Sequence, residues 1–92
     1  MEINDDVVLV AILQRGGVFP VTAKDLVEGS QRELIFRATR DVFVPPDALE
    51  MVQRSIDRLE AAGFLAESCG TPGRRITATG LEHLSKIASV AP

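Results

Sequence analysis

The sequence has one cysteine and one histidine, and this shortage excludes two kinds of site. Cys69 alone cannot form an internal disulfide. Together with His83 it supplies too few ligands for a zinc site built from cysteine and histidine. We therefore expect neither a metal nor another cofactor, and this cysteine usage is typical of the reducing cytoplasm.

Basic residues are also in short supply. The chain has ten Lys and Arg residues and 13 Asp and Glu residues, which gives a formal net charge of −3. Such a chain does not coat nucleic acid non-specifically, so any nucleic-acid binding must come from a local basic patch. The arginines that could build one form two groups: Arg32, Arg37 and Arg40, and then Arg54, Arg58, Arg74 and Arg75.

Long hydrophobic runs and catalytic motifs are absent too. The apolar run VVLVAIL at 7–13 is too short to span a bilayer, and the acidic residues before it are unlike a signal peptide. The sequence contains no Ser/His/Asp constellation, phosphate-binding glycine loop or metal-ligand spacing. We expect a soluble cytoplasmic protein that is not an enzyme.

What is present suits one small domain covering residues 1–92. The hydrophobic fraction of 46% is that of a globular protein. A chain of this length buries a small core, so a dimer interface is a natural supplement to it.

The apolar run at 7–13 fits a buried strand or a buried helix by its pattern alone. The capping residues favour a helix: Asn4 or Asp5 is a suitable N-cap, and Gly16-Gly17 is a suitable end. A helix that is apolar on most sides needs cover on most sides, which a partner subunit could supply.

Residues 18–21 (VFPV) read as a short extended piece, because Pro20 restricts Phe19 to the β region. TAKD at 22–25 then matches a capping box in which Asp25 replaces the usual glutamate. Gly29 leaves two alternatives for 22–40, one helix with a weak point or two helices joined there. The two prolines at 45–46 end this helical part.

Residues 47–62 give the clearest helical pattern. Leu49, Val52, Ile56 and Leu59 repeat at helical spacing on one stripe. The other side carries polar residues, namely Glu50, Gln53, Arg54, Asp57 and Arg58.

A hairpin and a last helix are expected after Gly63. FLAES and RRITA read as strands joined by the turn CGTPG, which puts Arg74 and Arg75 near the hairpin tip. Thr77 or Thr79 then caps a helix with apolar residues at 81, 84, 87 and 88.

Two phrases at fixed spacing in this region carry a resemblance. RLEAAGFL contains Arg58, Leu59, Glu60, Gly63, Phe64 and Leu65, and RITATG contains Ile76, Thr77 and Gly80. Over residues 47–88 the chain resembles winged helix-turn-helix proteins, and is most similar to the PadR and MarR type regulators of bacteria and phages. The fold class implied is α+β and mostly helical, with a β-hairpin wing and a post-wing helix. The fit is poorer in the N-terminal half, where residues 29–46 stand in place of a short turn.

The resemblance implies a homodimeric transcriptional regulator that binds double-stranded DNA. The helix at 47–62 would read the major groove, and the basic wing at about 69–76 would contact the phosphate backbone. The residues implied as DNA-binding are Gln53, Arg54, Arg58, Arg74 and Arg75. The first and last helices would form the dimer.

Two alternatives remain open at this point. Intrahelical ion pairs, such as Glu50 with Arg54, can neutralise the arginines of the helix at 47–62. An acidic winged-helix domain can then serve as a protein–protein interaction module, either as a complex subunit or as a phage-encoded inhibitor. Residues 30–40, with Arg32, Arg37 and Arg40, are a second candidate for the recognition helix.

Overall fold

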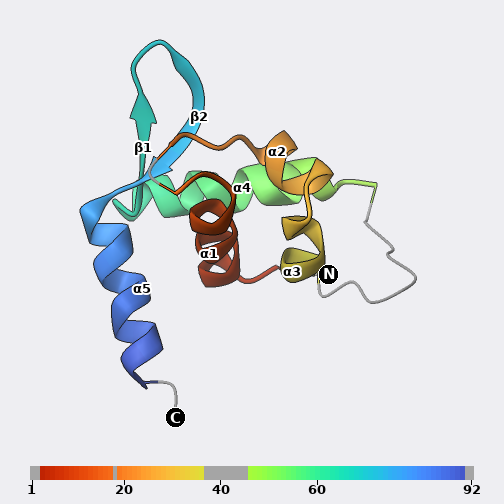
Figure 1. Ribbon diagram of the computed structural model, residues 1–92. Helices are drawn as coiled ribbons and strands as arrows, with labels where there is room; N and C mark the ends of the chain where they lie inside the picture. Colours follow the sequence, from red (N-terminus) through yellow and green to blue (C-terminus); the bar gives the residue numbers. More distant parts are fainter. Residues whose placement is uncertain (1–2, 18, 37–45, 91–92) are drawn as a thin grey trace.

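The protein is a mostly helical α+β domain in this computed structural model, which describes residues 3–17, 19–36 and 46–90 (Figure 1). The elements follow in the order α1 (Asp5–Gly16), α2 (Ala23–Glu28), α3 (Gln31–Phe36), α4 (Ala48–Ala61), β1 (Leu65–Ser68), β2 (Thr71–Ile76) and α5 (Ala78–Val90). Helices α1 and α2 pack against α4, and α3 packs against α1 and α2. The hairpin extends from the end of α4, and α5 lies on the side away from α2 and α3 (Figure 1).

The apolar run at 7–13 is helical, as its capping residues indicate. The Asn4 side chain accepts hydrogen bonds from the backbone N–H groups of Asp6 and Val7, and Gly17 ends α1 with a φ of 62°. Four apolar side chains of α1 are fully buried within this chain: Val8, Leu9, Ala11 and Ile12. A partner subunit is therefore not needed to cover that part of the helix.

Two helices, rather than one, follow the extended piece. Thr22 and Asp25 form the expected capping box, with the Thr22 N–H donating to Asp25 Oδ2 at 3.0 Å. This backbone hydrogen bond lowers the pKa of the Asp25 carboxyl below its usual value. Helix α2 ends before Gly29, and α3 ends at Phe36. Arg37 and Arg40, two of the three arginines of the alternative recognition helix, lie outside the described residues.

The core consists of apolar side chains from α1, α2, α3, α4 and the hairpin. The stripe expected on α4 contributes Val52, Ile56 and Leu59, which are buried, whereas Leu49 is half exposed at 51%. Ser55 is the one polar residue buried within the described part of the chain, and its hydroxyl donates a hydrogen bond to Asp5.

The hairpin differs from the expected one. Cys69 and Gly70 form the turn, and β2 already begins at Thr71, so Pro72 and Gly73 belong to a strand. Arg74 pairs with Glu67 and Arg75 with Ala66. The expectation that the two arginines lie near the hairpin tip is wrong, because the shorter turn places them in the half of β2 that leads to α5.

A backbone bridge joins the hairpin to the extended piece before α2. Val21 and Arg74 exchange two hydrogen bonds of 2.9 Å between their N–H and carbonyl groups. Gly73 permits this approach: its φ is 100°, and a Cβ at this position would lie 2.9 Å from the Val21 carbonyl carbon and oxygen. Gly73 is therefore needed for the close approach of β2 to the backbone of Val21.

The last helix begins as expected at a threonine. Thr77 Oγ1 accepts a hydrogen bond from the Gly80 N–H at 3.0 Å and donates one to the Gly63 carbonyl at 2.7 Å. The ring of Phe64 stacks on that of His83 with 4.4 Å between centroids. These contacts hold the start of α5 against the end of α4.

Replacing Gly73 should destabilise the fold more than replacing Gly70, although both have a positive φ. Gly73→Ala combines backbone strain with a clash against Val21, and we expect a loss of about 3 kcal/mol in the free energy of unfolding. Gly70→Ala meets no atom within 4 Å and should lose only about 1 kcal/mol. Urea denaturation of both variants measures this, and equal losses would contradict the close approach at Gly73.

Candidate nucleic-acid interface

The solvent-facing side of α4 carries two side-chain pairs, each of which joins residues one helical turn apart. Arg54 Nη2 bonds to Glu50 Oε1, and Gln53 Nε2 donates to Asp57 Oδ1 at 3.0 Å. The Glu50–Arg54 pair confirms the intrahelical pairing that the sequence pattern predicts. Both side chains of that pair are well exposed, at 62% and 65%. These two pairs together present one arginine, one amide and two carboxylates.

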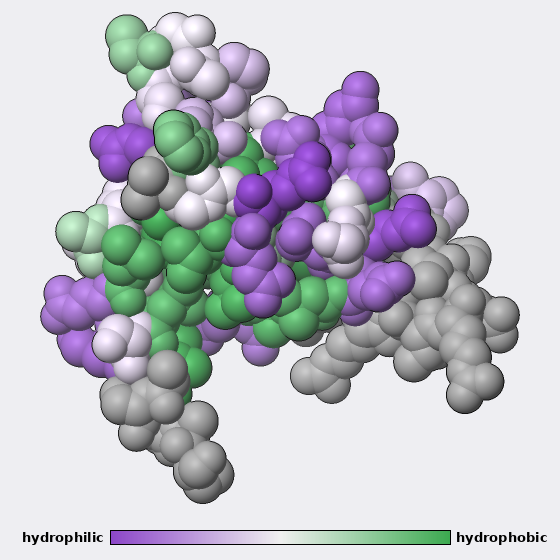
Figure 2. Space-filling view, in the orientation of Figure 1, coloured by the Kyte–Doolittle hydropathy of each residue, from purple (hydrophilic) through white to green (hydrophobic). Residues whose placement is uncertain are grey.

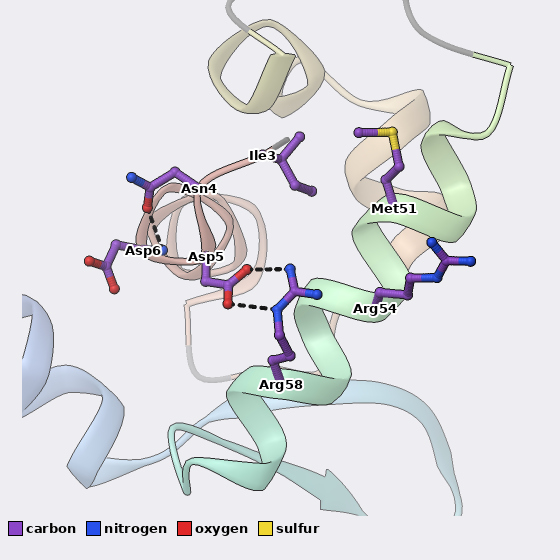
Figure 3. A pocket seen from close by; sticks show the side chains of 7 residues that line it. All are labelled: Ile3, Asn4, Asp5, Asp6, Met51, Arg54 and Arg58. Carbon is purple, nitrogen blue, oxygen red and sulfur yellow. Dashed lines mark hydrogen bonds and ion pairs between the residues drawn. The ribbon is translucent and has the colours of Figure 1, made fainter. Parts of the chain in front are cut away.

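Arg58 contacts the first turn of α1. Its Nε and Nη2 donate to the two carboxylate oxygens of Asp5 at 2.9 Å and 2.7 Å, which is a bidentate arrangement (Figure 3). The Ser55 hydroxyl donates to the same carboxylate at 2.6 Å. Asp5 thus joins the first turn of α1 to two residues of α4.

These hydrogen bonds set the charge state of Asp5. The hydrogen bond from Arg58 holds the pKa of the Asp5 carboxyl below its usual value. Partial burial acts in the opposite direction, while Ser55 and the positive charge of Arg58 lower the pKa further. Asp5 is therefore a carboxylate at neutral pH, and its charge offsets that of Arg58.

A hollow of about 500 Å³ lies beside this pair, between the start of α1 and α4 (Figure 3). Arg54, Arg58 and Met51 line it from α4, and Ile3, Asn4, Asp5 and Asp6 line it from the other side. Positive and negative side chains thus face the same open space.

The two arginines of β2 have different surroundings, as expected for neighbours on a strand. Arg74 donates through Nε to Glu60 Oε2 at 2.7 Å, and its Nη2 lies 3.7 Å from Glu67. It is also partly buried, so it braces the hairpin against α4. Arg75 is exposed and forms no ion pair within the described part of the chain.

The five predicted DNA-binding residues therefore lie on α4 and β2 without forming an uninterrupted positive surface. Four of them bind carboxylates of this chain, and Arg75 alone does not. The sequence pattern missed Asp5 as the partner of Arg58, because the two are 53 positions apart and no local signal links them. It also missed that Glu60 pairs with Arg74.

A second contact of the first turn of α1 involves His83. Its Nε2 lies 2.8 Å from Asp6 Oδ1, and the ring also stacks on Phe64. The imidazole is half-buried and holds α5 against α1. Cys69 is exposed at the hairpin turn.

An apolar groove of about 310 Å³ lies among α1, α3 and α5. Its walls are formed mainly by Val7, Val10, Leu34, Leu84 and Ile87. Leu34 and Ile87 are 39% and 40% exposed, as is Leu81 on α5 at 40%. Figure 2 shows apolar surface extending from α5 across to α1.

The described residues contain no group of three or more His, Cys, Asp or Glu side chains placed to hold a metal ion. Within the same residues, none of the helices has the length and apolar character needed to cross a membrane. Comparison with protein-family models, with curated proteins and with solved structures gives no match for this chain.

Arg58→Ala should destabilise the fold more than Arg54→Ala, although both remove an arginine from α4. Arg58→Ala leaves the Asp5 carboxylate without its bidentate partner, and we expect a loss of about 1 kcal/mol at pH 7, a value discounted for solvent screening. Arg54→Ala removes an exposed pair within one helix and should cost less than about 0.5 kcal/mol. Urea denaturation at neutral pH measures both.

The loss of unfolding free energy in Arg58→Ala should also depend on pH. A carboxyl whose pKa falls on folding stabilises the fold above its unfolded pKa, and this contribution disappears as the pH falls through the lower folded value. The difference between wild type and Arg58→Ala should therefore narrow below about pH 4. A difference that stays constant down to pH 2 would contradict the pairing of Asp5 with Arg58.

Proposed function

We propose that this protein is a winged-helix DNA-binding protein, a small transcriptional regulator that acts as a homodimer. One observation carries the proposal: α4 exposes a polar face and leads through Gly63 into a hairpin whose second strand is bridged back to Val21. A helix followed directly by a hairpin and then by a further helix is the arrangement that the resemblance over residues 47–88 implies.

In this proposal α4 enters the major groove, where a helix fits and base edges can be distinguished. Gln53 and Arg54 are the side chains best placed to meet base edges or phosphates, because both are exposed on the polar face. Arg75 is the backbone contact of the hairpin. Arg74 has a different role, because its guanidinium is committed to Glu60.

The pairing of Arg54 with Glu50 is compatible with DNA binding. Exposed pairs four residues apart in a helix contribute only about 0.3–0.5 kcal/mol. A phosphate that carries a full negative charge can replace such a partner at small cost, whereas the bidentate Arg58–Asp5 pair is harder to replace.

The homodimer is assigned to the apolar groove among α1, α3 and α5. A domain of this size gains from covering the partly exposed Leu34 and Ile87, because each apolar side chain contributes about 1.5–3 kcal/mol when fully removed from water. Two-fold pairing across this groove would present two copies of α4 to a pseudo-palindromic site.

A second function is favoured by one specific observation. Gln53, Arg54, Arg58 and Arg74 each already bind a carboxylate of this chain, so this side of the molecule has no strong positive field. Such a surface suits docking to another protein better than attraction to a polyanion. The alternative is therefore a winged-helix interaction module, either a complex subunit or an inhibitor, that does not bind DNA.

Binding to mixed genomic DNA fragments across a salt series separates the two functions. We expect affinity to fall with salt, and Arg75→Ala to reduce the slope of log K against log salt by about 0.9, the loss of one phosphate contact. Arg15→Ala is the matched control, since Arg15 is also exposed but lies in the last turn of α1, and it should leave the slope unchanged. Absence of binding at low salt would overturn the DNA proposal and favour the interaction module.

Ile87→Lys should convert the dimer into a monomer, because it places a charge in the apolar groove. Thr79→Lys adds the same charge at an exposed position at the start of α5, outside the groove-lining residues, and should leave the dimer intact. Size-exclusion chromatography with light scattering measures both masses. A monomeric wild type, or a dimeric Ile87→Lys variant, would overturn the assignment of this groove.

A further inference from the structure

The Asp5 carboxylate occupies the edge of Arg58 that a DNA phosphate would use. Carboxylates and phosphates both bind a guanidinium through two parallel N–H groups. In Arg58 the Nε and Nη2 groups already donate to Asp5 at 2.9 Å and 2.7 Å. An arginine to which the resemblance gives a DNA-binding role is therefore bound by a group that takes the place of the phosphate.

The surroundings of the pair fit a phosphate subsite that this acidic residue fills. Arg54 and Arg58 lie one helical turn apart on α4 and line the same open hollow of about 500 Å³ (Figure 3). Two guanidiniums at this spacing suit one phosphate or two successive phosphates of a DNA strand. Asp5 faces them from the first turn of α1.

The bond network of Asp5 indicates that this contact is held firmly. Three donors on α4 reach its carboxylate: Ser55 Oγ at 2.6 Å and the two nitrogens of Arg58. The hydroxyl of Ser55 belongs to a buried residue and fixes the carboxylate in position. The Asp5 contact therefore differs from the exposed Glu50–Arg54 pair on the outer face of α4, whose carboxylate a phosphate can replace at small cost.

We propose that Asp5 is an autoinhibitory residue: it blocks the phosphate-binding edge of Arg58 and thereby limits the affinity of α4 for DNA. This inference depends on the proposed DNA-binding function. Wild-type protein binds DNA without a phosphate contact from Arg58, and removal of the Asp5 charge adds that contact.

Asp5→Asn tests the proposal, because it removes the charge and keeps the size of the side chain and an acceptor for Ser55. In the salt series, the slope of log K against log salt should become steeper by about 0.9, the value for one added phosphate contact. Asp57→Asn is the matched control: it also removes one negative charge from the surface beside α4, at a side chain that accepts from Gln53. This control should change the slope by clearly less than the value for one phosphate contact.

A double-mutant cycle separates this effect from a general change in charge. If Asp5 acts through Arg58, Asp5→Asn should have no effect on the slope in an Arg58→Ala background. If the slope steepens equally in both backgrounds, the proposal is overturned. Asp5→Ser provides a second variant with the charge removed, should Asp5→Asn unfold, and circular dichroism verifies folding of each protein.

The outcomes also distinguish this inference from the function on which it depends. DNA binding by wild type with the same slope in Asp5→Asn overturns the role of Asp5 and leaves the DNA-binding function standing. Absence of binding by both proteins at low salt overturns both.

Discussion

Two backbone hydrogen bonds between Val21 and Arg74 hold the arrangement of this domain together. They attach the chain segment before α2 to β2, and so fix the hairpin relative to the helices that pack on α4. The same bridge sets the direction of the neighbouring side chains. With Arg74 turned toward Glu60, strand alternation directs Arg75 away from that contact. Gly73 is the residue that makes the bridge sterically possible.

Local patterns predicted most of the helical structure. The caps at Asn4 and Thr22 and the apolar stripe of α4 are short-range features, and each defines an element that the structure contains. The turn of the hairpin was predicted wrongly. The sequence places Gly73 in the turn, because a glycine pattern alone does not separate a turn from a strand that another backbone approaches closely.

The charge pattern was only partly predictable, for a physical reason. Pairs four residues apart, such as Glu50 with Arg54, follow from helix geometry and need no knowledge of the fold. Arg58 finds Asp5 and Arg74 finds Glu60 only after separate elements have packed together. The same arginines that suggest a basic DNA-binding surface in the sequence are therefore largely neutralised in three dimensions, and the hairpin presents Arg75 as its exposed cation.

The first turn of α1 has a consequence for how this chain folds during synthesis. Asp5 reaches Arg58, 53 positions later, and Asp6 reaches His83, 77 positions later. Helix α1 therefore leaves the ribosome long before the partners of its acidic residues are made. Contacts of such high sequence separation close large loops and form late, after local helices are in place. A nascent chain that ends before α4 carries an N-terminal helix whose two carboxylates still lack their partners, because Arg58 lies on α4 and His83 on α5.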